Sequence, residues 1–87
     1  MIDKRTDYIA WAALMHELED AESGLKSLFK DIAENPSFDE TDFRTHMAHI
    51  YAHLNRAWNA RNATVEQQDN ESLWNQWAAF PTDIEPL

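Results

Sequence analysis

Three of the four histidines lie in one short segment, at spacings that could bring their side chains together. His46, His49 and His53 are three and four residues apart, so they share one flank of a helix, which turns by about 100° per residue. Two histidines four residues apart can bind one metal ion from a single helix. Histidine is also the side chain whose charge changes near neutral pH. This flank therefore indicates a divalent-metal site or a pH-responsive group.

A carboxylate from the preceding segment could join these histidines. If the chain reverses direction near Pro36, Glu22 lies level with His53. The simplest interpretation is a Glu–His contact that satisfies two half-buried polar groups, because the segment lacks the glutamate of the zinc-protease pattern. The alternative is a divalent-metal site made of Glu22, His46, His49 and His53. No other cofactor is expected.

The opposite flank of the same segment is nearly uncharged in a chain that is otherwise rich in acids. Low charge combined with an aromatic side chain is typical of a protein interface. The alternative is that a third helix of the same chain covers this flank. The predicted interface residues are Tyr51, Ala52, Asn55, Asn59 and Asn62.

These side chains must be positioned by helices, because apolar residues recur every three or four positions along most of the chain. Residues 6–34 have the pattern of one long amphipathic helix, with an apolar stripe of Trp11, Leu14, Leu18, Ala21, Leu25, Leu28 and Ile32. Residues 38–62 predict a second long helix, with a stripe of Phe43, Met47, Ile50, Leu54 and Trp58. The single glycine, Gly24, lies inside the first helix, where a missing side chain indicates close packing by another helix or by an indole.

The break between the two long helices is predicted at Asn35 and Pro36, because the residue before a proline is disfavoured in the α region. The second helix can begin with a capping box formed by Ser37 and by Glu40 three residues later. A short connection of this kind makes the two helices antiparallel neighbours. The second helix is predicted to end at residue 62 or, as an alternative, to continue towards Gln67.

A third, shorter helix is predicted for residues 70–80, capped by Asp69 or Asn70 and ended by Pro81. The tail, residues 81–87, is too short and too rich in proline for more structure. The fold class is therefore all-α, with one domain over residues 1–87: an antiparallel hairpin of two long helices completed by the third as a three-helix bundle. If the third helix is too short to cover the apolar surface, two hairpins would pair as a dimer with four long helices.

The composition of the chain excludes some kinds of site and disfavours some kinds of partner. The chain has no cysteine, which excludes disulfides and thiolate metal sites, and its net charge is −9, from sixteen acidic and seven basic residues. A field of this sign repels phosphate backbones, so nucleic acid is not an expected partner. Neither a signal sequence nor an apolar run of membrane-spanning length is found, so we expect a cytoplasmic protein that does not bind membranes.

The sequence also lacks a nucleophile with a matched base and a glycine loop that could hold a phosphate. We therefore expect that the chain is not an enzyme and predict a small acidic helical protein-interaction module, an adaptor or regulatory subunit that can also form a homodimer. The alternative is a metal- or pH-responsive protein that uses the histidine flank. Two further alternatives are a carrier of hydrophobic ligands, with Trp74 and Trp77 at its pocket, and an acidic inhibitor that mimics DNA.

Overall fold

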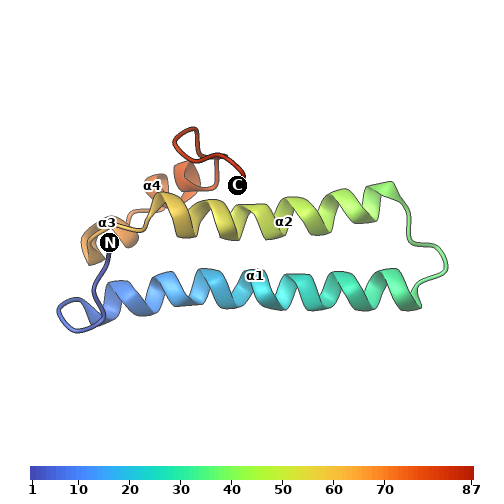
Figure 1. The fold of residues 1–87 in the computed structure, drawn as a ribbon, viewed down its shortest axis with the longest axis horizontal. Helices are drawn as coiled ribbons and strands as arrows, with labels where there is room; N and C mark the ends of the chain where they lie inside the picture. Colours follow the sequence, from blue (N-terminus) through green and yellow to red (C-terminus); the bar gives the residue numbers. More distant parts are fainter.

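The computed structural model describes all 87 residues, Met1–Leu87, and all its regular elements are α-helices. The helices are α1 (Tyr8–Glu34), α2 (Glu40–Asn59), α3 (Val65–Gln68) and α4 (Glu71–Trp77). The two long helices run antiparallel, side by side, and the two short ones lie at the open end of this hairpin (Figure 1). The predicted all-α hairpin of two long helices is thus confirmed. None of the four helices combines the length and the hydropathy of a bilayer-spanning segment.

The turn between the long helices begins where the sequence predicts it. Asn35 ends α1, and its side-chain oxygen accepts a hydrogen bond of 2.9 Å from the backbone N–H of Ser37. This bond keeps Ser37 outside the next helix, so the predicted capping box of Ser37 and Glu40 is wrong. Asp39 and Asp42 form the capping box instead, each side chain accepting from the backbone N–H of the other at 3.0 and 3.1 Å. Helix α2 consequently begins at Glu40.

The second half of the chain contains shorter helices than predicted. Helix α2 ends at Asn59, three residues before the predicted end. The four-residue α3 was not expected, and a capping box of Thr64 and Gln67 begins it. The predicted N-cap at Asn70 is confirmed, because its side chain accepts from the backbone N–H of Leu73 at 3.1 Å. Helix α4 ends at Trp77, so only part of the predicted range 70–80 is helical.

The short helices do not complete a three-helix bundle. Helix α4 packs against α2 and α3 but not against α1, while α3 packs against α1. The Gln68 side chain donates a hydrogen bond of 3.1 Å to the backbone oxygen of Ala10 and so ties α3 to the beginning of α1. The predicted three-helix bundle is not confirmed, and most of the length of the α1–α2 seam is left without a covering helix.

The core follows the line along which α1 and α2 meet. Its buried apolar residues are Ala10, Leu14, Ala21, Leu28, Ile50, Ala57 and Ala63. At Gly24, a β-carbon would lie only 3.0 Å from Cγ1 of Ile50, so the close approach expected at this glycine is made by α2. No large side chain is completely buried. The core is therefore a thin layer between two helices.

Candidate functional site

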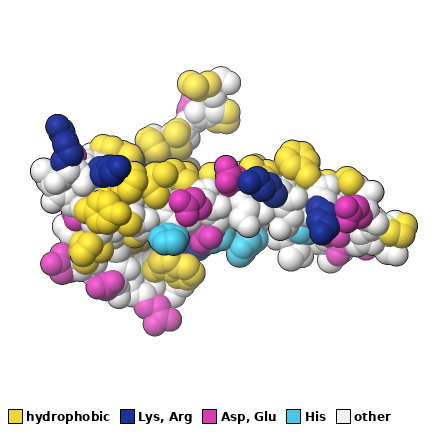
Figure 2. All heavy atoms as spheres, turned by 90° about the horizontal axis from the view of Figure 1, so that it is seen from below, with side chains coloured by type: hydrophobic (Ala, Val, Ile, Leu, Met, Phe, Trp, Pro, Cys, Tyr) yellow, Lys and Arg dark blue, Asp and Glu magenta, His cyan; other side chains and the backbone are white.

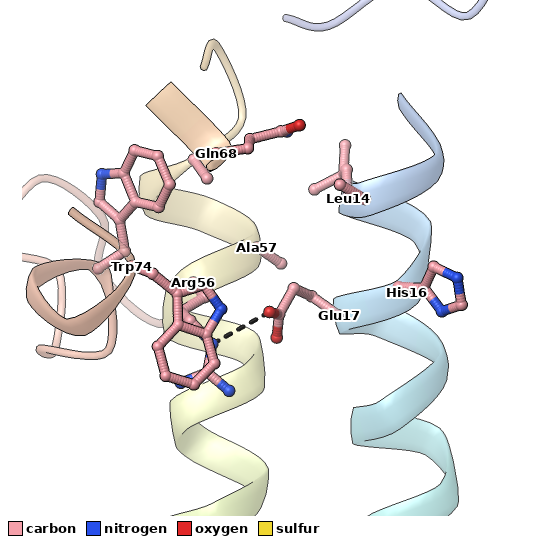
Figure 3. A pocket seen from close by; sticks show the side chains of 10 residues that line it. Leu14, His16, Glu17, Arg56, Ala57, Gln68 and Trp74 are labelled. Carbon is pink, nitrogen blue, oxygen red and sulfur yellow. Dashed lines mark hydrogen bonds and ion pairs between the residues drawn. The ribbon is translucent and has the colours of Figure 1, made fainter. Parts of the chain in front are cut away.

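The most buried ionisable groups meet at Glu17, near the open end of the hairpin. One of its carboxylate oxygens lies 2.8 Å from Nδ1 of His53, and the other accepts a hydrogen bond of 3.1 Å from Nε of Arg56 (Figure 3). His53 and Arg56 are only 8% and 6% exposed. The Arg56 guanidinium also stacks 4.0 Å from the ring centroid of Trp74, a favourable cation–π geometry. One carboxylate thus joins α1, α2 and α4.

The carboxylate predicted for this position, Glu22, is elsewhere. Glu22 is exposed and lies 3.6 Å from Nζ of Lys26 on its own helix. It follows Glu17 by five residues and is therefore turned away from it by about 140° around α1. The prediction of Glu22 as the partner of His53 is wrong, whereas the predicted type of contact, a carboxylate on a half-buried histidine, is found. The signal that could have found Glu17 is its seven-residue spacing to Gly24, which also faces α2.

The structure brings two of the three predicted histidines into contact. The Nε2 atoms of His49 and His53 are 3.1 Å apart, and their rings meet edge to face. His46 is held separately, with its Nε2 atom 3.0 Å from Oδ2 of Asp31. No group of three histidine, aspartate or glutamate side chains is arranged to hold a metal ion. The histidine flank therefore offers a pair of nitrogens rather than a complete coordination set.

Nδ1 of His53 lies between two groups of opposite hydrogen-bonding character. It is 2.8 Å from Oε2 of Glu17, which only accepts when it is ionised, and 3.1 Å from Nη2 of Arg56, which only donates. The Nε2 atom of His53 faces that of His49 on the other side of the ring. The same three histidines line a groove with Asp20, Ser23 and Ser27, here called the histidine groove.

Two asparagines of the predicted interface, Asn55 and Asn59, form hydrogen bonds within the chain. The Asn55 side chain donates to the backbone oxygen of Ala78 at 2.8 Å, and Asn59 donates to those of Trp77 and Ala79 at 2.8 and 3.0 Å. These bonds satisfy carbonyl groups at the C-terminal end of α4. Asn55 is buried as a result, whereas the remaining members of the set, Tyr51, Ala52, Asn59 and Asn62, are half-buried or exposed. The ring of Tyr51 packs edge to face on Phe80 at 5.1 Å.

The two tryptophans proposed for a ligand pocket do line a hollow. It has a volume of about 250 Å³ and lies between α1, α2 and the short helices. Its lining includes Leu14, Glu17, Arg56, Gln68, Trp74 and Trp77 (Figure 3). This volume is slightly below the roughly 300 to 1,000 Å³ of typical ligand pockets. Glu17 and Arg56, which are in contact with each other, form part of its wall.

The side of the hairpin opposite the histidine groove is apolar. Gly24 faces Ile50 across the seam, so the residues before and after it are turned about 100° in opposite directions. Ser23 lines the histidine groove, and Leu25 therefore lies on the other side. The residues of this other side, here called the apolar face, are Leu18, Leu25, Phe29 and Ile32 of α1 and Phe43, Met47 and Leu54 of α2. In Figure 2, hydrophobic side chains follow the upper long edge of the molecule, and histidines lie in a row below that edge.

The predicted core stripe of the first helix is therefore only half covered. Leu14, Ala21 and Leu28 are buried, whereas Leu18, Leu25 and Ile32 remain 41%, 42% and 50% exposed. No protein-family model matches the chain, and comparison with curated proteins and with solved structures also finds no match. The functional proposal consequently rests on the geometry of the two sides of the hairpin.

Proposed function

We propose that this chain is a small acidic protein-interaction module without catalytic activity, which binds a protein through the apolar face. The observation that carries the proposal is the exposure of large apolar side chains from both long helices on one side of the hairpin. Phe29 is 70% exposed, and Phe43 and Leu54 are 42% and 41% exposed. Contiguous exposed apolar surface is characteristic of protein interaction sites, and here it runs along two packed helices rather than over a mobile loop.

The ionisable groups in the seam support the non-catalytic part of this proposal, because they are engaged with one another. Glu17 is shared between His53 and Arg56, and Asp31 is paired with His46. Every buried side-chain nitrogen and oxygen has a hydrogen-bond partner. These groups hold the helices together, whereas Leu18, Leu25 and Phe29 of the apolar face remain 41%, 42% and 70% exposed.

A matched pair of substitutions tests whether the apolar face binds a protein. The tagged full-length chain, its Leu25→Glu variant and its Ile9→Glu variant would be incubated with an extract of the native cells, and retained proteins would be identified by mass spectrometry. Ile9 is a suitable control because it is on the same helix, is 67% exposed and precedes Leu18 by nine residues, half a turn around α1. Both substitutions introduce the same carboxylate.

We expect the wild type and Ile9→Glu to retain the same partner, either another protein or untagged copies of the chain, and Leu25→Glu to lose it. Circular dichroism of the three proteins would confirm that each keeps its helices. Retention of identical proteins by the wild type and by a folded Leu25→Glu variant would exclude the apolar face as the binding surface.

A second candidate function is a metal- or proton-responsive protein that uses His49 and His53. The specific observation in its favour is the 3.1 Å separation of their Nε2 atoms, with Glu17 bonded behind His53. A ligand that binds the folded state raises its melting temperature, so zinc, nickel and cobalt would be titrated against wild type, His49→Ala and His16→Ala. His16 serves as the control because its side chain is 78% exposed. A metal-dependent rise in the wild type and His16→Ala but not in His49→Ala is expected; identical responses in all three proteins would exclude this site.

A further inference from the structure

We propose that the occupant of the apolar face is a second copy of this chain, so that two hairpins pack face to face as a four-helix bundle. This inference rests on the proposed function, because it names the partner of the same face. Three properties of the single chain lead to it: the surface that it leaves exposed, the area of the apolar face, and the repeat of the side chains along it.

A single hairpin is less compact than a folded protein of its mass. Its accessible surface is 6543 Å², whereas a compact monomer of 10.2 kDa would expose about 5,300 Å². Its radius of gyration is 14.8 Å, against about 12 Å for a compact chain of this length. The excess surface is on the order of 1,000 Å². A second molecule covering one side of the hairpin would remove surface of this size.

The apolar face is large enough for a stable dimer. Six of its seven side chains are 41% to 70% exposed, which amounts to on the order of 600 Å² of apolar surface per chain. Standard protein interfaces bury about 800 Å² per partner, including a polar rim. The apolar core of such an interface is therefore already present on one face, and the residues that border it would supply the remainder.

The repeat of the apolar face fits another long helix. Leu18, Leu25 and Ile32 are spaced by seven residues, the repeat with which helices pack along a coiled-coil seam. Their span of fourteen residues corresponds to about 21 Å along α1. An interface with two-fold symmetry uses the same patch on both subunits, and this chain itself presents two long helices with apolar side chains on that patch.

Charge does not oppose the pairing at the face itself. None of the residues of the apolar face is ionisable, and charges of both signs border it: Glu22 and Glu40 are acidic, and Lys26 and Arg44 are basic. The charge of −9 on each copy acts at longer range, where salt screens it. Added salt is consequently expected to strengthen the dimer, the opposite of its effect on a complex held by ion pairs.

Sedimentation velocity of the full-length chain over a wide dilution series tests the inference. The wild type and Ile9→Glu are expected to have twice the mass of the 10.2 kDa chain at high concentration and to dissociate on dilution. Leu25→Glu is expected to weaken the dimer by about a hundredfold or more, because it places a carboxylate in both copies of an apolar contact. If Leu25→Glu loses its helices, Phe29→Glu replaces it, since Phe29 is 70% exposed in the single hairpin.

The outcomes separate this inference from the proposed function. A wild type that remains at 10.2 kDa at every concentration overturns the second copy as occupant, and so does equal dimerisation by the wild type and a folded Leu25→Glu variant. In either case, loss of a different protein by Leu25→Glu in the cell-extract experiment would leave the proposed function standing. If the chain does not dimerise and Leu25→Glu retains the same proteins as the wild type, both the second copy and the proposed function are overturned.

Discussion

The two sides of the hairpin differ in what holds them together. In the histidine groove and the seam beneath it, carboxylates of α1 meet bases of α2: Glu17 meets His53 and Arg56, and Asp31 meets His46. On the apolar face, large side chains of both helices remain 41% to 70% exposed. One side is complete within the chain, and the other is not. The difference is that the polar side chains between the helices are paired within the chain, whereas large apolar side chains on the other side remain partly exposed.

The polar side is suited to this role because its contacts depend on direction. Ion pairs and hydrogen bonds form at only one rotation and one register of the two helices, whereas apolar packing tolerates several. The contacts at Glu17 and Asp31 are fourteen residues apart on α1, so together they determine its rotation as well as its register. Buried ion pairs add little net stability on average, and specificity of pairing is the role that we assign to them here.

The largest loss of stability is expected when Glu17 is replaced. The Glu17→Ala substitution leaves Arg56 and His53 buried without their carboxylate, and loss of one partner of a buried ion pair typically costs about 3 to 5 kcal/mol. Because the side chain of Glu17 is still 18% exposed, we expect the lower end of that range in the free energy of unfolding, measured with urea.

The matched control is Glu19→Ala, because the side chain of Glu19 is 65% exposed and its only ion-pair contact is with His16, whose side chain is 78% exposed. Its expected effect is within about 0.5 kcal/mol. If the two alanine variants unfold at the same urea concentration, Glu17 does not hold the helices together.

The second prediction compares the seam with the apolar face through two leucines of α1. Leu28 is 6% exposed and Leu25 is 42% exposed in the single hairpin. Leu28→Ala should lower the free energy of unfolding by about 2 to 3 kcal/mol at every protein concentration, because it opens a cavity in the core. Leu25→Ala should have a smaller effect at low concentration that grows as the concentration rises, because the proposed dimer would bury Leu25.

Urea unfolding at several protein concentrations measures both variants. The wild-type midpoint itself is expected to rise with concentration, as it does for any protein stabilised by self-association. A concentration-independent effect of Leu25→Ala, together with a fixed wild-type midpoint, would contradict the assignment of the apolar face to a second copy.

A smaller effect is expected at the contact between Gly24 and Ile50. Alanine is favoured over glycine inside a helix by about 1 kcal/mol, but a β-carbon at Gly24 would lie 3.0 Å from Ile50. Gly24→Ala should therefore be more favourable by roughly 1 kcal/mol in an Ile50→Ala background than in the wild type. A double-mutant cycle in urea measures this coupling. Additive effects of the two substitutions would show that the helices do not pack tightly at this point.

Much of the hairpin could be predicted from the sequence, because local rules determine it. The residue before Pro36 is excluded from the helix, and α1 does end at Glu34 with Asn35 as its cap. The glycine inside a strong helix predicted a close approach, which α2 makes through Ile50. The asparagine before the last helix predicted its N-cap, which Asn70 provides.

The rotation of α1 could not be predicted, because its apolar stripe is wider than one neighbouring helix can cover. The residues Leu14, Ala21 and Leu28 can face α2 in either of two rotations of α1. In the first rotation Glu17 and Gly24 also face α2, and in the second Leu18 and Leu25 do. Only the second column is apolar. Apolar periodicity favours the second column, which predicts Glu22 near the seam and Glu17 on the solvated side. The ion pairs of Glu17 favour the rotation that buries the first column. They are made with His53 and Arg56, which lie 36 and 39 residues further along the chain.

The smallest effect concerns the C-terminal residues, which Asp83 attaches to the end of α2. The indole N–H of Trp58 donates to its carboxylate at 2.8 Å, and a guanidinium N–H of Arg61 donates to its other oxygen at 3.4 Å. The bond from Trp58, with a smaller contribution from Arg61, holds the pKa of Asp83 below the usual value of an aspartate. A carboxylate with a lowered pKa in the attached state stabilises that state fully above the pKa of the detached state.

As the pH falls through the lowered pKa of Asp83, the carboxylate is protonated and the attachment weakens. The indole N–H signal of Trp58 in a nuclear magnetic resonance spectrum should therefore shift with acidification in the wild type. Asp83→Asn removes the titrating group and keeps an oxygen that can accept from the indole, so its Trp58 signal should lie near one position throughout. Parallel shifts in the two proteins would mean that another group governs the tail. The Tyr51–Phe80 contact, which lies nearer α4, is expected to persist at acid pH, because it is a packing of two aromatic rings without a carboxylate.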